Sequence, residues 1–79
     1  MQIEYKRKAV KYIESCDRNT QQRLKAAIEK LPFGDIKKLT GLENDYRLRV
    51  GDLRVLFTKE NDKIIINAVI PRGQAYKKL

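Results

Sequence analysis

The sequence predicts an α+β fold with the order β-α-α-β-β-β, in which a curved antiparallel sheet carries an N-terminal helical hairpin packed on one face. Apolar residues recur at helical spacing up to residue 31 and alternate with polar residues from Tyr46 onward. A segment with one proline and two glycines separates the two patterns. A chain of 79 residues can form one small core, so we expect a single domain over residues 1–79.

The composition is that of a globular protein, with 42% hydrophobic and 35% charged residues. No apolar run approaches the roughly 20 residues that span a bilayer, and the basic N-terminal residues lack the apolar core of a signal peptide. The single cysteine, Cys16, provides neither a disulfide framework nor a metal cluster. We therefore expect a cytoplasmic protein without a metal or cofactor.

The charge balance is more informative. The formal net charge is +8, which favours polyanionic partners: nucleic acid, an acidic protein or an anionic membrane surface. The chain also contains no histidine. This excludes a Ser-His-Asp triad, a Cys-His pair and a histidine-ligated zinc, so any proton transfer near neutral pH must use another residue.

The N-terminal elements are a short strand over residues 2–5 and two amphipathic helices. The first helix is expected from Lys6 to Cys16, because its apolar residues recur at i, i+3, i+4 and i+7: Ala9, Tyr12, Ile13 and Cys16. Residues 17–20 break this pattern and offer capping side chains. The second helix, over residues 20–31, repeats the spacing with Leu24, Ala27, Ile28 and Leu31, and Pro32 ends it.

Residues 32–44 are interpreted as a connection, held to the core by Ile36 and Leu39 with Lys37 and Lys38 facing outward. A strand then begins at Tyr46 and ends at Val50. Gly51 and Asp52 suit a two-residue hairpin turn, because glycine at the first central position fits a type II′ turn.

The second strand of this hairpin covers residues 53–58, with Leu53, Val55 and Phe57 on the core face. A polar reversal over residues 59–63 leads to the last strand, residues 64–70. That strand is apolar on nearly both faces, as expected of a central, covered strand. Pro71 ends it, and a basic tail follows.

Three arginines of the hairpin are the main candidates for function. The two-residue turn places Arg49 opposite Arg54, with Arg47 one step along the same face. The face could be merely solvated, but we favour phosphate binding. All three residues carry the planar guanidinium fork that matches phosphate, and the opposite face is apolar. Arg72 follows the last strand and reaches this region if that strand pairs with residues 53–58.

Other candidates lie near the C-terminus. Tyr76 either packs its ring against the sheet edge or serves in proton transfer beside the arginines, whose charges favour the phenolate form. Lys77 is a possible further phosphate contact, whereas Lys78 is interpreted as a solubilising residue. Cys16 lies on the apolar stripe of the first helix, which favours a core position over a nucleophile. The carboxylates show no metal-ligand spacing or catalytic pairing.

Three segments together resemble the RelE/ParE superfamily of toxins from type II toxin–antitoxin systems, and the RelE branch in particular. They are the N-terminal IEYKRKAVKYI, the central KKLTGLENDYRLRVGDLRVLF and the C-terminal PRGQAY. The most specific parts are the strand with alternating basic residues before a short turn, and the arginine and tyrosine four residues apart. The similarity covers essentially the whole chain.

The resemblance implies a ribosome-dependent endoribonuclease that cleaves mRNA in the ribosomal A site and so inhibits translation. In this family the ribose 2′-hydroxyl attacks the adjacent phosphate. By position, Arg47 and Arg49 match the two basic residues that hold the RNA backbone and help activate the attacking group, and we add Lys77 to this RNA-binding set. Arg54 and Arg72 match arginines that stabilise charge on the phosphate or assist the leaving oxygen, and the sequence does not fix which arginine serves as acid, base or charge stabiliser. Tyr76 matches a tyrosine that stacks on the base and takes part in proton transfer.

The resemblance also implies a partner, an acidic antitoxin protein that wraps the toxin and covers its basic face. Two alternatives remain on the same fold. One is a ParE-like gyrase poison, against which the combination of arginines and Tyr76 argues. The other is a non-catalytic nucleic-acid-binding module that uses the arginines as phosphate clamps.

Overall fold

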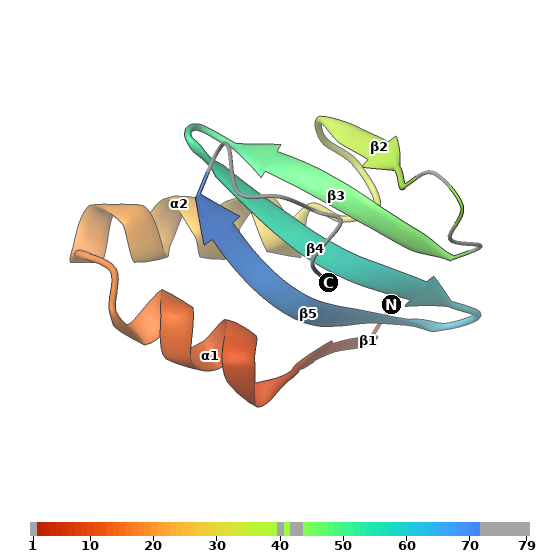
Figure 1. Cartoon of the computed structure of the whole chain (residues 1–79), viewed down its shortest axis with the longest axis horizontal. Helices are drawn as coiled ribbons and strands as arrows, with labels where there is room; N and C mark the ends of the chain where they lie inside the picture. Colours follow the sequence, from red (N-terminus) through yellow and green to blue (C-terminus); the bar gives the residue numbers. More distant parts are fainter. Residues whose placement is uncertain (1, 40, 42–43, 72–79) are drawn as a thin grey trace.

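The computed structural model describes residues 2–39, 41 and 44–71, which form two helices and a five-stranded sheet (Figure 1). The helices are α1 (Arg7–Glu14) and α2 (Arg18–Glu29). The strands are β1 (Gln2–Tyr5), β2 (Ile36–Lys38), β3 (Asp45–Val50), β4 (Leu53–Glu60) and β5 (Lys63–Pro71). The predicted α+β class and the order of the predicted elements are confirmed.

The two helices form the predicted hairpin. Asp17 is the N-cap of α2 and its carboxylate accepts a hydrogen bond from the backbone N–H of Thr20 at 3.4 Å. Gln21 ties the start of α2 to the end of α1, because its amide donates to the carbonyl oxygens of Ile13 at 3.0 Å and Cys16 at 3.2 Å. No helix in the described part of the chain is long and apolar enough to cross a membrane.

The strand order is β1-β5-β4-β3-β2, and Figure 1 shows the sheet curving in front of α2. The three pairs from β2 to β5 are antiparallel, but β1 runs parallel to β5, so the sheet is mixed rather than wholly antiparallel. Both helices and three strands separate β1 from β5 in the sequence, so no tight turn joins the two strands. A pair without a hairpin turn can be parallel.

The connection predicted over residues 32–44 contains a strand that the sequence pattern missed. β2 pairs with β3 so that Ile36 lies opposite Leu48 and Lys37 opposite Arg47. Ile36 packs against the core and both lysines are exposed, as expected. The short strand extends the sheet beyond β3 and places Asp35, the residue before it, beside Arg49.

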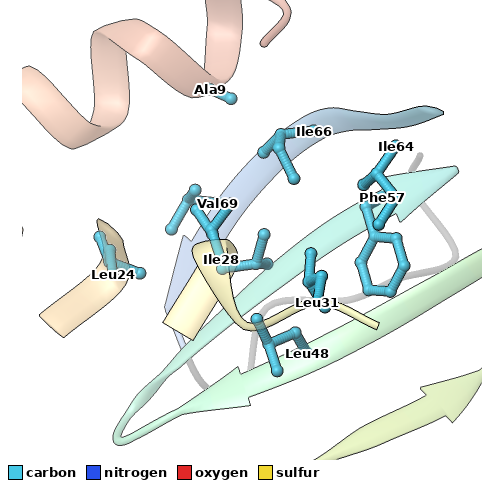
Figure 2. Packing of buried hydrophobic residues seen from close by; sticks show 10 residues of the cluster. Ala9, Leu24, Ile28, Leu31, Leu48, Phe57, Ile64, Ile66 and Val69 are labelled. Carbon is cyan, nitrogen blue, oxygen red and sulfur yellow. The ribbon is translucent and has the colours of Figure 1, made fainter. Parts of the chain in front are cut away.

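The core lies between the helical hairpin and one face of the sheet. Figure 2 shows Ile28 and Leu31 beside side chains of the strands. The predicted apolar stripes of both helices are confirmed, and Cys16 is a half-buried residue packed against this core. The core cluster comprises Ala9, Leu24, Ile28, Leu31, Leu48, Val55, Phe57, Ile64, Ile66 and Val69.

Candidate functional site

The β3–β4 hairpin places three arginines on the sheet face away from the helices. Gly51 has a φ of +58°, a conformation that favours glycine, and this tight turn sets the register. Arg49 pairs with Arg54, and Arg47 pairs with Leu56, as predicted. Because neighbouring residues on these strands belong to the core cluster, alternation puts the three arginines on the opposite face. We call this the arginine face.

Arg47 and Arg49 share an acidic neighbour, Asp35. The Asp35 carboxylate lies 3.5 Å from Nη1 of Arg47 and 3.9 Å from Nε of Arg49. Its backbone carbonyl accepts hydrogen bonds from Nη1 of Arg47 at 3.2 Å and from the backbone N–H of Arg49 at 3.0 Å. Asp35 therefore offsets part of the repulsion that the three arginines would otherwise experience.

Arg54 is in a different environment. Its Nη1 atom is buried and has no hydrogen-bond partner among the described residues. It faces Arg49 across the β3–β4 pair and Ile70 across the β4–β5 pair. A buried guanidinium nitrogen without an acceptor is costly in a folded protein, and in native structures such a group calls for a specific explanation, such as a bound water, an ion or a catalytic role.

The rest of the arginine face combines an apolar patch with a polar cluster. Leu56 and Ala68 pair across β4 and β5 and are only 2% and 3% exposed, although neither belongs to the core cluster. Beyond them, Thr58 donates to the Asp45 carboxylate at 2.5 Å and accepts from the Asn67 amide at 2.8 Å. These side chains link β3, β4 and β5 and hold the hairpin in place beside the last strand.

Arg72, Tyr76 and Lys77, the remaining predicted site residues, lie outside the described residues. The strand before them, β5, pairs with β4 as the placement of Arg72 required, and it ends at Pro71, opposite Leu53 and one position from Arg54. Within the described part of the chain, no group of three His, Cys, Asp or Glu side chains is arranged to hold a metal ion.

Asp35 is the site residue that sequence reasoning missed. It precedes a strand of only three residues, which is too short to show an alternating pattern. Without that strand there was no register to place Asp35 opposite Arg49. The one available signal was an acidic residue shortly before Lys37 and Lys38, and that signal is weak.

No protein-family model matches the sequence. The chain is 30% identical over 84 aligned residues to a curated protein named Toxin RelE3 from Methanocaldococcus jannaschii, with 96% of each chain covered.

Solved structures show the same fold. A RelB–RelE antitoxin–toxin complex from Methanococcus jannaschii superposes with a TM-score of 0.75 at 28% identity, covering 86% of this chain and 88% of that chain. An archaeal RelE–RelB complex from Pyrococcus horikoshii OT3 has a TM-score of 0.75 at 27% identity, with 94% and 97% covered. The isolated E. coli RelE toxin has a TM-score of 0.73 at 13% identity, with 98% and 89% covered, and supports the fold alone.

These similarities confirm the resemblance seen in the three sequence segments. The curated relative spans nearly the whole chain, and the fold of the structural neighbours agrees with the sheet and helical hairpin described above. The protein belongs to the RelE family of toxins.

Proposed function

We propose that this toxin is a ribosome-dependent endoribonuclease that cleaves mRNA in the ribosomal A site and thereby inhibits translation in the cytoplasm. The observation that carries the proposal is the direct pairing of Arg49 with Arg54 on the face away from the helices. Two guanidinium groups brought together in this way are destabilising unless an anion lies between or beside them. The backbone of a single-stranded RNA supplies one such anion per nucleotide.

The proposed reaction is an internal transfer at phosphorus that needs no metal ion. The ribose 2′-oxygen forms a bond to the adjacent phosphate as the bond from phosphorus to the 5′-oxygen breaks. The 2′-hydroxyl loses its proton and the departing 5′-oxygen gains one, which leaves a cyclic phosphate and a free 5′-hydroxyl. Negative charge grows on the non-bridging oxygens, where preorganised guanidinium groups are most effective.

The residues divide into two sets in this proposal. Arg47, Arg49 and Lys77 bind the RNA backbone. Arg54 and Arg72 stabilise the charge on the phosphate. The unpartnered Nη1 atom of Arg54 supports this assignment, because a phosphate oxygen would give it the acceptor that the described residues do not provide.

Tyr76 completes the proposed catalytic set. Its ring would stack on the substrate base, and its hydroxyl would take part in proton transfer. The chain has no histidine, so a phenol held among cations is the available group for this role.

The proposed regulator is an acidic antitoxin that covers the arginine face. Two of the similar structures are complexes of a RelE toxin with a RelB antitoxin. A net charge of +8 on this chain also favours an acidic partner. An antitoxin bound over the arginines would exclude RNA from them.

The test is induced expression followed by mapping of transcript 5′ ends, for the wild type, Tyr76→Phe and Arg54→Ala. New 5′ ends are expected with the wild type and should be lost in both variants. Tyr5→Phe is a matched control, because it removes the same hydroxyl from a half-exposed residue of β1, and it should cleave normally. DNA breaks without new transcript ends would instead support a gyrase poison. The absence of both new transcript ends and DNA breaks would support a simple binding module.

A further inference from the structure

Asp35, Arg49 and Arg54 lie in one row across the arginine face. Arg49 pairs with Arg54 on one side. On its other side the backbone N–H of Arg49 donates to the carbonyl of Asp35, which continues the β2–β3 register by one residue. Arg49 thus has a negative neighbour on one flank and a positive neighbour on the other, each about one strand spacing away.

Among the described residues, the side-chain hydrogen bonds and ion pairs of the three arginines decrease from β2 toward β4. Arg47 is the most restrained: its side chain is only 14% exposed and its Nη1 atom lies near both the carboxylate and the carbonyl of Asp35. Arg49 is 47% exposed and lies at the longer distance of 3.9 Å from the same carboxylate. Arg54 has a buried Nη1 atom without a partner among the described residues.

We propose that Asp35 is a positioning residue that fixes Arg47 and draws the Arg49 guanidinium toward β2, so that a phosphate can bind between Arg49 and Arg54. Attraction by Asp35 and repulsion by Arg54 act on Arg49 in the same direction, which opens the space between the two arginines. The catalytic consequence rests on the proposed nuclease function, whereas the geometry of Asp35 does not.

A competing role for Asp35 has the opposite consequence. The carboxylate is 58% exposed and could act as a substitute anion that RNA must displace from Arg47 and Arg49. Removing its charge would then tighten RNA binding and speed cleavage. In the positioning role, removal of the charge slows the chemical step, while binding of the polyanion stays unchanged or tightens because one negative charge is gone.

The test compares Asp35→Asn with Asp62→Asn in cleavage of an mRNA on purified ribosomes. Asp62 is exposed in the β4–β5 turn, at the opposite end of β4 from Arg54. Its replacement therefore removes one negative charge, as Asp35→Asn does, but at a site distant from the arginines. Asp35→Asn is expected to lower kcat roughly 10–100-fold with KM unchanged or lower. The kcat and KM of Asp62→Asn should each stay within about twofold of the wild-type values, which corresponds to a marginal change in free energy. Asp35→Glu should recover part of the lost kcat.

A second measurement separates this inference from the nuclease assignment. Side-chain ¹⁵N relaxation of the Nε–Hε groups reports the order of each guanidinium without any substrate. Arg47 and Arg49 should become more mobile in Asp35→Asn and keep their order in Asp62→Asn. If the wild type cleaves no mRNA, the nuclease proposal fails and these spectra alone decide the role of Asp35. Unchanged order of both arginines, or a higher kcat in Asp35→Asn, would overturn the positioning role.

Discussion

Arg49 of β3 and Arg54 of β4 lie directly opposite each other on the sheet face away from the helices. Like charges in this relationship oppose folding. The fold tolerates them because Asp35 flanks Arg49, and because the other face of the hairpin contributes Leu48, Val55 and Phe57 to the core. Stability supplied by one face of the sheet thus supports an unfavourable arrangement of charges on the other.

Replacing Arg54 by methionine should therefore stabilise the protein and inactivate it. Arg54→Met removes the unpartnered Nη1 atom and the repulsion with Arg49 while keeping an unbranched apolar stem. We expect the free energy of unfolding to rise by about 1–2 kcal/mol in urea denaturation, with loss of mRNA cleavage. Arg18→Met, at the exposed start of α2, should change stability by less than about 0.5 kcal/mol. A marked loss of stability in Arg54→Met would mean that the guanidinium has a structural role.

Arg49→Gln should weaken binding to single-stranded RNA and reduce its salt dependence. Each phosphate neutralised on a single strand contributes about 0.7 to the slope of log Kobs against log salt concentration. Loss of one contact should lower the magnitude of the slope by about that amount for RNA of any sequence, as measured by fluorescence anisotropy with a labelled oligonucleotide. Arg7→Gln removes an equal charge from exposed α1 and should leave the slope nearly unchanged. Equal slopes for Arg49→Gln and the wild type would remove Arg49 from the RNA-binding set.

The two phenylalanines provide a test of the core. Phe57 is 1% exposed and stacks on Tyr46 with ring centroids 5.5 Å apart, whereas Phe33 is 76% exposed. Phe57→Ala should cost about 3–5 kcal/mol of unfolding free energy, enough to unfold much of a domain with so small a core. Phe33→Ala should change it by less than about 0.5 kcal/mol. Chemical denaturation of both variants gives the comparison, and similar losses in the two would contradict the core assignment.

The hairpin at the centre of the site was predictable because its determinants are local. Gly51 and Asp52 specify a tight turn, and the alternation on either side specifies the faces, so the pairing of Arg49 with Arg54 follows from the sequence alone. The helical stripes are equally local, since residues three and four apart share a helix face.

What the sequence could not predict depends on partners distant in the chain. β2 has three residues and exists through its pairing with β3, so both the strand and the contacts of Asp35 required the three-dimensional structure. β1 runs parallel to β5, and this pairing joins strands from the two ends of the described part of the chain, which no local pattern in the sequence specifies. The pairing of β5 with β4 shifts by one residue between Leu56 and Phe57, and the largely apolar sequence of β5 gave no sign of this shift. Asn67 lies at the shift, and its side-chain amide donates a hydrogen bond to the Thr58 hydroxyl.

Acid should weaken the helical hairpin through Asp17. The hydrogen bond from Thr20 holds the pKa of this carboxyl below its usual value, and the charge of Arg23 acts in the same direction. A lowered pKa in the folded state contributes stability above the unfolded-state pKa of about 4, and this contribution is lost as the pH falls through the folded-state value. Asp17→Asn keeps an acceptor at the N-cap but cannot ionise. The wild type should therefore be the more stable of the two in urea at pH 7, and the difference should vanish in strong acid. A difference that persists unchanged below about pH 2 would assign the effect to packing rather than to the ionised carboxylate.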